Sequence, residues 1–334
     1  MFQNLRKSKK LLLIAMTCAT FAIAGCGSDT TKTTGDNGTS VTWSETFDGT
    51  KTDFAVKSSP THAVSMSQAT TEMMLQLGLE DKMAGTAFKE EEIYPPLQAA
   101  YDKVKVLSDK WPSYEVFMSV KPDFATGWPD SFSKRAIPAD KMIAQKVNIW
   151  LPESMLSTKA DLETNFNDMI KLGEIFGVKS KAEEWVAGQR KTLAAIQDKL
   201  KDLPRKRVFI YDSEDGQPFT AFEGYTTNIL KLIGADNVMS GLGVDKTWAK
   251  GSWETVIAQN PDYIIIADYG TSIRNDDDFQ QKIEKIKSNP QLQDITAVKE
   301  GHFIRVKLSE ITPGVRTVDA LKRLAEEIHG VKID

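Results

Sequence analysis

The chain has 334 residues, of which 41% are hydrophobic and 26% charged, a globular composition in a chain too long for one typical domain. Residues 1–25 contain four basic and no acidic side chains, so the remainder carries 38 basic against 46 acidic residues. This acidic excess argues against nucleic acid as a partner.

The first 25 residues have the layout of a secretory signal. A basic stretch precedes an apolar run, Leu11 to Ala24, that is too short to span a bilayer stably. The run leads into Ile23-Ala24-Gly25-Cys26, which resembles the lipobox of bacterial lipoproteins. That resemblance implies cleavage before Cys26, which becomes the lipid-bearing N-terminus and anchors the protein to a membrane. The alternative is an ordinary export signal with an incidental Cys.

A tether is expected to follow the signal. Residues 27–40 contain no apolar side chain and cannot bury a core, so 26–57 are expected to form the lipidated Cys and a flexible tether. The second cysteine, Cys18, lies in the signal that cleavage removes, so the mature chain has no disulfide of its own.

Two motifs occur twice, in the same order, in the two halves of the body. Thr70-Thr71-Glu72-Met73-Met74-Leu75-Gln76-Leu77-Gly78 returns as Thr226-Thr227-Asn228-Ile229-Leu230-Lys231-Leu232-Ile233-Gly234. Ser113-Tyr114-Glu115 through Lys121-Pro122-Asp123 returns as Ser252-Trp253-Glu254 through Asn260-Pro261-Asp262. Each copy has helical spacing of apolar residues, and the second motif leads into an apolar run typical of a buried parallel strand.

The repeats predict an α/β protein of two similar lobes, 58–179 and 204–334. Between them, a charged segment with apolar residues at helical spacing begins near Ser180 and stops before Pro204. We expect a connecting helix over 180–203, although a helix belonging to one lobe only is an alternative. Further strands are expected at 63–67, 147–151, 207–212 and 302–307.

These motifs resemble the helical-backbone class of substrate-binding proteins of ABC importers for iron-siderophore, heme and vitamin B12. Ala63-Val64-Ser65 with Thr71 to Leu79 resembles the family's first strand and helix, the two Glu-to-Pro-Asp motifs its lobe signatures, and Pro313-Gly314-Val315-Arg316 its last loop. The resemblance covers roughly residues 58 to 330. It implies two Rossmann-like lobes with parallel sheets joined by one long helix, a ligand cleft between them, and delivery to a membrane permease.

The resemblance also assigns permease docking to one glutamate in each lobe. By matching of the motifs these are Glu115 and Glu254. The alternative is that each is an acid in the first turn of a helix, favoured there by the helix dipole.

Ligand contacts are expected in loops that follow the parallel strands. These loops are rich in aromatic residues suited to stacking on a large flat or apolar ligand. The aromatic candidates are Trp111, Trp128, Phe132, Trp150, Tyr225, Trp248 and Tyr269. Nearby cations that could neutralise carboxylates or catecholate oxygens are Arg135, Lys250, Arg274 and Arg316. For each aromatic the alternative is a place in the core, and for Arg316 it is an ion pair with Asp319 or Glu310.

Direct binding of a bare transition metal requires clustered imidazoles or thiolates, and the chain has only His62, His302 and His329. The carboxylate run Glu90 to Glu92 is interpreted as a solvated face. No G-x-S-x-G, Walker A, H-E-x-x-H or dinucleotide fingerprint occurs, so we expect neither an enzyme nor a resident cofactor. The ligand is expected to be a metal chelate, with ferric siderophore ranked ahead of cobalamin and heme. A sensing or adhesive lipoprotein is the remaining class, and we expect an extracytoplasmic, lipid-anchored monomer.

Overall fold

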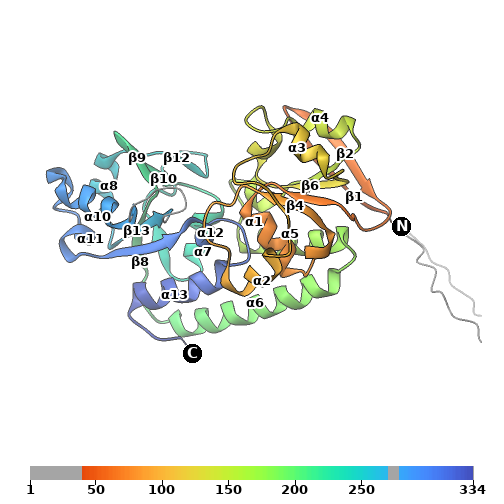
Figure 1. Cartoon of the computed structure of the whole chain (residues 1–334). Helices are drawn as coiled ribbons and strands as arrows, with labels where there is room; N and C mark the ends of the chain where they lie inside the picture. The colour runs from red at the N-terminus through yellow and green to blue at the C-terminus, as the bar shows by residue number, and fades with distance from the viewer. Residues whose placement is uncertain (1–39, 270–277, 334) are drawn as a thin grey trace, which may run out of the picture. The chain divides into compact units, whose positions relative to one another are not determined.

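A computed structural model describes residues 40–269 and 278–333. The predicted signal, Cys26 and Arg274 lie outside these residues. The described chain forms two α/β lobes, each built around a parallel sheet, and Figure 1 shows one on either side of the molecule. The predicted fold class is therefore confirmed.

The N-terminal lobe has a five-stranded parallel sheet in the order β5-β4-β3-β6-β7. Its strands are β3 (Ala63–Ser65), β4 (Met83–Ala87), β5 (Val106–Ser108), β6 (Phe124–Thr126) and β7 (Asn148–Trp150). The helices and turns are α1 (Gln68–Gln76), η1 (Glu80–Lys82), η2 (Pro95–Leu97), α2 (Gln98–Tyr101), α3 (Tyr114–Ser119), η3 (Pro129–Phe132), α4 (Ala139–Ala144), η4 (Glu153–Met155) and α5 (Leu162–Ile175).

The C-terminal lobe has a four-stranded parallel sheet in the order β11-β8-β13-β14, beside a smaller antiparallel sheet, β12-β10-β9. The strands are β8 (Lys206–Tyr211), β9 (Ser213–Asp215), β10 (Gln217–Ala221), β11 (Ala235–Asn237), β12 (Trp248–Lys250), β13 (Tyr263–Asp268) and β14 (Phe303–Lys307). The helices and turns are α7 (Tyr225–Lys231), α8 (Trp253–Gln259), α10 (Asp278–Ser288), η5 (Pro290–Leu292), α11 (Thr296–Glu300), α12 (Leu308–Ile311) and α13 (Thr317–His329).

The two sequence repeats are structural repeats. Helices α1 and α7 carry the first motif and are each followed by a glycine with positive φ, Gly78 at 67° and Gly234 at 70°. Helices α3 and α8 carry the second motif. Ser113 and Ser252 cap them by accepting a hydrogen bond from a first-turn backbone N–H, and each helix leads into a central strand.

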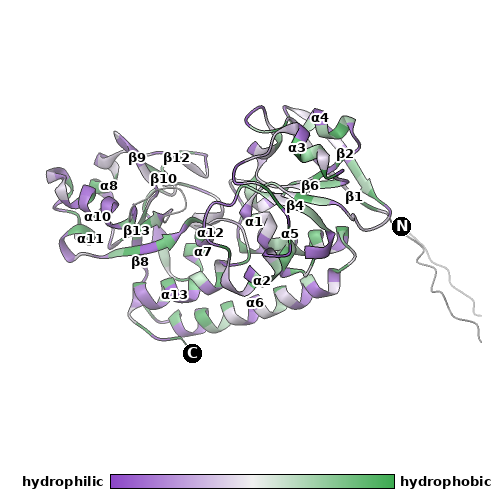
Figure 2. Cartoon of the chain, viewed as in Figure 1, coloured by the Kyte–Doolittle hydropathy of each residue, from purple (hydrophilic) through white to green (hydrophobic). Residues whose placement is uncertain are grey.

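The connecting helix is α6 (Lys179–Leu200), one residue longer at its start than expected and three shorter at its end. It runs beneath both lobes in the view of Figure 1, with α13 alongside. Figure 2 shows hydrophobic and hydrophilic residues alternating along both helices, and the buried residues of each recur at helical spacing, so each helix buries an apolar stripe. One apolar cluster therefore extends from Met73 in the N-terminal lobe through Ile196 of α6 to Leu321 of the C-terminal lobe.

The expectation of a flexible tether over residues 26–57 is wrong for its last part, residues 41–56. Residues 41–56 form an antiparallel hairpin, β1 (Val41–Phe47) with β2 (Thr50–Val56). A two-stranded hairpin is marginal by itself, and this one is fixed to the edge of the N-terminal lobe. The Trp43 ring stacks on Phe54 with centroids 5.7 Å apart, and its Nε1 donates to the Ile149 carbonyl at 2.8 Å.

Candidate ligand-binding site

A pocket of about 310 Å³ lies between the lobes. Its lining residues are Phe88, Glu90, Trp111, Trp128, Asp130, Asp212, Phe219, Trp248, Tyr269, Leu308 and Thr312. Most of them follow the carboxyl ends of parallel strands of both sheets, where open α/β sheets collect ligands. The volume lies at the lower end of small-molecule sites, which span roughly 300 to 1,000 Å³.

Each lobe contributes one stacked aromatic pair to the pocket. On the N-terminal lobe, Phe88 and Trp111 stack at 4.4 Å between centroids with 10° between planes. On the C-terminal lobe, Phe219 and Trp248 stack at 6.2 Å with 16° between planes. The Trp111 Nε1 donates to the Met66 carbonyl at 3.1 Å, which fixes the orientation of that indole. The pocket therefore has an aromatic wall on each lobe.

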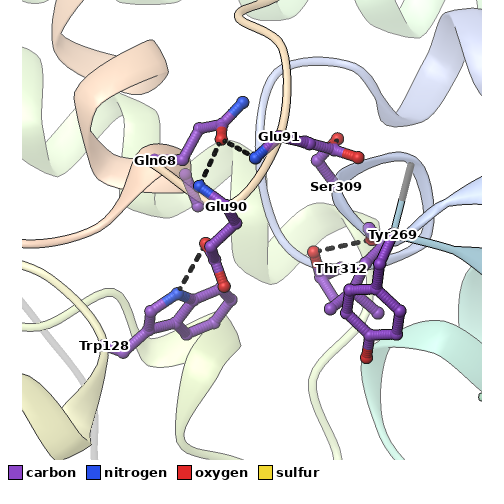
Figure 3. A pocket seen from close by; sticks show the side chains of 9 residues that line it. Gln68, Glu90, Glu91, Trp128, Tyr269, Ser309 and Thr312 are labelled. Atoms are coloured by element: carbon purple, nitrogen blue, oxygen red, sulfur yellow. Dashed lines mark hydrogen bonds between the residues drawn. The ribbon is translucent and has the colours of Figure 1, made fainter. Parts of the chain in front are cut away.

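Phe88 has an unusual backbone. Its φ is 60°, in the left-handed region that an aromatic residue with a Cβ rarely adopts. The loop that follows is held by Gln68 on α1, whose Oε1 accepts hydrogen bonds from the backbone N–H groups of Glu90 at 2.9 Å and Glu91 at 2.8 Å (Figure 3). Strained residues persist where the surroundings fix them, and they gather at functional sites.

Three carboxylates line the pocket, and the described lining residues include no Lys or Arg. Burial raises the pKa of Glu90 to about 7, partly offset by the Trp128 indole N–H, which donates to its Oε2 at 3.1 Å. The Tyr269 hydroxyl donates to Asp212 at 2.5 Å, and burial together with Asp212 raises the pKa of that phenol, which therefore remains protonated. Asp130 is paired with Arg135 at 2.5 Å.

A second, much smaller chamber adjoins the pocket and shares Glu90, Trp128, Tyr269, Leu308 and Thr312 with it. Its volume is about 20 Å³, enough for about one water molecule. Figure 3 shows Gln68, Glu90, Glu91 and Trp128 of the N-terminal lobe facing Ser309, Thr312 and Tyr269 of the C-terminal lobe across it.

Arg316 does not line the pocket. It is 5% exposed and forms a buried ion pair with Glu72 of α1, with its Nε 2.8 Å from Oε2, and a longer contact of 3.4 Å with Glu91. Its Nη2 also donates to the Glu92 carbonyl at 2.7 Å. The expected ligand contact is thus wrong, and the alternative partners Asp319 and Glu310 are not its hydrogen-bond partners.

The same contacts correct the interpretation of the Glu90 to Glu92 run as a solvated face for Glu91, whereas Glu92 is exposed as expected. Glu91 is 5% exposed and accepts a hydrogen bond from the Ser309 hydroxyl, while Glu92 pairs with Lys307 at 2.6 Å. Tyr94 donates to Asp319 across the same contact. This set of contacts, which we call the lobe latch, joins residues 72 and 91–94 to residues 307–319.

The structure brings four of the predicted aromatics together in the pocket, Trp111, Trp128, Trp248 and Tyr269. Phe132, Trp150 and Tyr225 are each 3% exposed and belong to the apolar core, so ligand contact is wrong for them. Arg135 is exposed and pairs with Asp130 at the pocket's edge. Lys250, also exposed, pairs with Asp215 at 2.7 Å.

Sequence reasoning missed Phe88, Phe219, Glu90, Asp130 and Asp212. Strand β4 is followed by Phe88 and Glu90, and strand β8 by Asp212. Their position after a strand was the sequence signal that could have identified them as pocket residues. Phe219 lies within the small antiparallel sheet, which no repeat or apolar run indicated.

Glu115 and Glu254 lie in the first turns of α3 and α8 and are both exposed. Backbone hydrogen bonding at this helix start, with the Ser113 side chain, lowers the pKa of Glu115. No group of three or more His, Cys, Asp or Glu positioned to hold a metal ion occurs within residues 40–269 and 278–333. In those same ranges no helix is both long and apolar enough to cross a membrane.

Comparison with known proteins agrees with this architecture. A crystal structure of a periplasmic binding protein from Veillonella parvula is 96% identical, covers 89% of this chain and all of its own, and superposes with a TM-score of 0.87. The ABC transporter substrate-binding lipoprotein YvrC of Bacillus subtilis is 25% identical over 97% of this chain and 98% of its own length. A vitamin B12-binding protein of Vibrio vulnificus is 22% identical over 80% of this chain and 90% of its own.

The family model described as periplasmic binding protein matches residues 64–308, which include the central strands of both sheets and all but one of the pocket-lining residues. The resemblance of the sequence motifs to the helical-backbone class of substrate-binding proteins is confirmed. The chain belongs to the periplasmic binding protein family.

Proposed function

We propose that this protein captures a metal chelate outside the cytoplasm and delivers it to the permease of an ABC importer. The observation that carries the proposal is the pocket between the lobes, to which each lobe contributes a stacked aromatic pair. Such walls suit the extended faces of a chelate better than a bare ion. The similarity to YvrC, an ABC transporter substrate-binding lipoprotein, and to vitamin B12-binding proteins supports an importer role.

Ferric siderophores rank first among the chelates in the sequence analysis because cations were expected beside the aromatic residues. That reason no longer holds for Arg316, Arg135 and Lys250, each of which is paired with a carboxylate. We keep a ferric siderophore as the first candidate, since the aromatic walls suit such a complex and the fourth expected cation, Arg274, lies outside the described residues. Cobalamin is the second, because the pocket is aromatic and acidic and because a relative is named for vitamin B12 binding.

Docking to the permease is assigned to Glu115 and Glu254. They occupy equivalent first-turn positions on two repeated helices, one in each lobe, and both are exposed. A permease dimer that presents one cationic patch to each lobe would contact both glutamates. Exposed charges of this kind speed the association of two proteins and fix their relative orientation. A lipid at Cys26 would hold the protein near that permease. The similarity to YvrC, which is named as a lipoprotein, supports this lipid anchor.

Reconstituted transport tests this proposal. With permease in vesicles and the bound chelate as cargo, Glu115→Ala/Glu254→Ala should keep its melting temperature and chelate affinity while uptake falls at least tenfold. The matched control replaces two exposed acids of α6, Glu183→Ala/Asp198→Ala, and should transport normally. Normal uptake by the first variant would refute the docking assignment, and loss of its chelate affinity would show that the two glutamates are structural.

A further inference from the structure

We infer that Gln68 is a positioning residue that couples the ligand pocket to the lobe latch. Its side-chain amide joins the pocket loop, which we define as residues 88–92, to the Glu72–Arg316 ion pair in one hydrogen-bonded network. A ligand in the pocket and the contact between the lobes then strengthen each other. The ligand part of this inference rests on the proposed function, whereas the network can be tested without ligand.

Gln68, the first residue of α1, is 2% exposed and bonds through both ends of its amide. Its Oε1 accepts from the backbone N–H groups of Glu90 at 2.9 Å and Glu91 at 2.8 Å (Figure 3). Its Nε2 donates to the Glu72 carboxylate and to the Glu92 carbonyl, both at 3.0 Å. These four bonds use the full capacity of the amide, and they fix its orientation, since backbone N–H groups only donate and carbonyl and carboxylate oxygens only accept.

The repeated helix does not require this glutamine. Counting back from the Thr-Thr pair of the first motif, Gln68 corresponds to Gly224, and α7 forms without a side chain there. Glu72 corresponds to Asn228, whose Nδ2 makes a different contact between the lobes, to the Ala160 carbonyl at 2.8 Å. The amide network is therefore a property of the side chains of α1 and not of the repeated scaffold.

On the pocket side, Gln68 holds a loop that supplies part of the lining. Phe88 and Glu90 of this loop both line the pocket. The Phe88 ring stacks on Trp111 although the Phe88 φ is 60°, a strained conformation that persists only where surrounding contacts fix it. The Glu90 carboxylate accepts from the Trp128 indole at 3.1 Å. The backbone bonds to Gln68 follow Phe88 by two and three residues, so they limit where both side chains can lie.

On the latch side, Gln68 shares its acceptors with Arg316 of the C-terminal lobe. Glu72 is bound by both, with Gln68 Nε2 3.0 Å from Oε1 and Arg316 Nε 2.8 Å from Oε2. The Glu92 carbonyl also accepts from both, at 3.0 Å from Gln68 and 2.7 Å from Arg316. Members of one buried hydrogen-bond network are not energetically independent. Because Arg316 fixes the two groups to which Gln68 donates, a change at Arg316 reaches the pocket loop through the amide.

Coupling between two sites is reciprocal. If a ligand that contacts Phe88 or Glu90 orders the loop and so strengthens the latch by some factor, the intact latch strengthens ligand binding by the same factor. Neither Glu72 nor Arg316 is among the described residues that line the pocket. A change at Arg316 should therefore reduce affinity through Gln68 and the loop, and not through a lost contact with the ligand.

Amide hydrogen exchange tests the network without ligand. Arg316→Lys keeps the buried charge but not the planar guanidinium, and it should speed exchange at the Glu90 and Glu91 N–H groups about fivefold or more. The matched control, Asn228→Leu, removes the contact between the lobes at the corresponding position of α7 and should leave exchange in the pocket loop unchanged. In Gln68→Met the acceptor of both N–H groups is already lost, so adding Arg316→Lys should change nothing further. Unaltered exchange in Arg316→Lys overturns the inference and leaves the proposed function standing.

Affinities measured as a double-mutant cycle test the coupling to ligand. The full chain is titrated by calorimetry with cyanocobalamin, heme and a ferric trihydroxamate, and the tightest of the three serves as probe for the variants. Gln68→Met should weaken that probe about tenfold or more and Arg316→Lys about fivefold, while Asn228→Leu should retain full affinity. Gln68→Met/Arg316→Lys should bind no more weakly than Gln68→Met alone, because the link between latch and pocket is already broken.

The outcomes separate this inference from the proposed function. Losses that multiply in the double variant, or full affinity in Gln68→Met, overturn the coupling while chelate capture stands. If none of the three probes binds, the proposed function fails, and the exchange experiment decides the inference by itself. Gln68→Glu serves where Gln68→Met does not fold. It keeps an acceptor for Glu90 and Glu91 but cannot donate to Glu72, so affinity should again be insensitive to Arg316→Lys.

Discussion

Arg316 offers the sharpest test of how the lobes are held together. Its side chain is 6% exposed, and those of Glu72 and Glu91 are 2% and 7% exposed. Arg316→Met would leave these two carboxylates buried without their cation. Removing one partner of a buried ion pair costs about 3 to 5 kcal/mol of unfolding free energy, which lowers the melting temperature of a protein this large by roughly 10 °C.

The magnitude depends on burial, so an exposed pair is the control. Arg135→Met breaks the pair with Asp130, whose side chains are 72% and 50% exposed, and should cost less than about 1 kcal/mol. Arg316→Met/Glu72→Gln removes charge from both sides and should recover part of the loss, since much of the loss comes from leaving a carboxylate unpaired. Arg316→Lys keeps the positive charge but lacks the planar guanidinium that can bind a carboxylate through two N–H groups. Its loss of unfolding free energy should lie between those of Arg135→Met and Arg316→Met.

Urea unfolding at pH 7, read by fluorescence and circular dichroism with one m-value per variant, measures these differences. Arg316→Met costing no more than Arg135→Met would refute the latch as a source of stability. Failure of the double variant to recover any stability would show that the loss comes from packing and not from unpaired charge.

Three further predictions concern the hairpin, the pocket and the anchor. Burial raises the pKa of Glu45 to about 7, so its folded form holds a proton that the unfolded form releases near 4.5; the stability it gives is present at low pH and lost as pH rises through 7. Glu45→Gln should therefore be more stable than the unmodified protein by about 2 kcal/mol at pH 8 and equal to it at pH 4, and a constant difference across that range contradicts the assignment. Trp128→Ala should weaken chelate binding at least tenfold and remove part of the fluorescence quenching, while the core Trp150→Phe should leave affinity unchanged; equal losses would place neither ring at the ligand. Cys26→Ala should leave unprocessed or released protein in a fractionation assay, and a variant still cut before residue 26 and retained on the membrane rules out lipidation there.

The sequence was most informative where the chain repeats. Helix α1 matches α7 and α3 matches α8, because the same apolar spacing, serine caps and closing glycines build the same local structure twice. The order of motifs then implied two lobes, and the general preference for strand carboxyl ends placed the pocket. Trp111, Trp128 and Tyr269 were found in this way.

Individual side chains were less predictable because burial depends on register. Trp150 is the last residue of β7 and points into the core, whereas Trp128 lies two residues beyond β6 and lines the pocket, yet both follow a similar apolar run. Arg316 meets Glu72 across 244 residues of chain, a pairing that no local pattern carries. The β1–β2 hairpin is equally dependent on tertiary contact, since Glu45 accepts from the Leu151 N–H at 3.0 Å on the neighbouring strand edge.

Calorimetric titration of the purified protein with chelates and with free ions tests the central claim most directly. We expect one chelate among cobalamin, heme and ferric siderophores to bind with one-to-one stoichiometry and a Kd of micromolar or tighter, which corresponds to about −8 kcal/mol or better. Binding should be accompanied by quenching of tryptophan fluorescence, because Trp111, Trp128 and Trp248 line the pocket. Tight binding of free Mn²⁺ or Zn²⁺ with no response to any chelate would contradict the account.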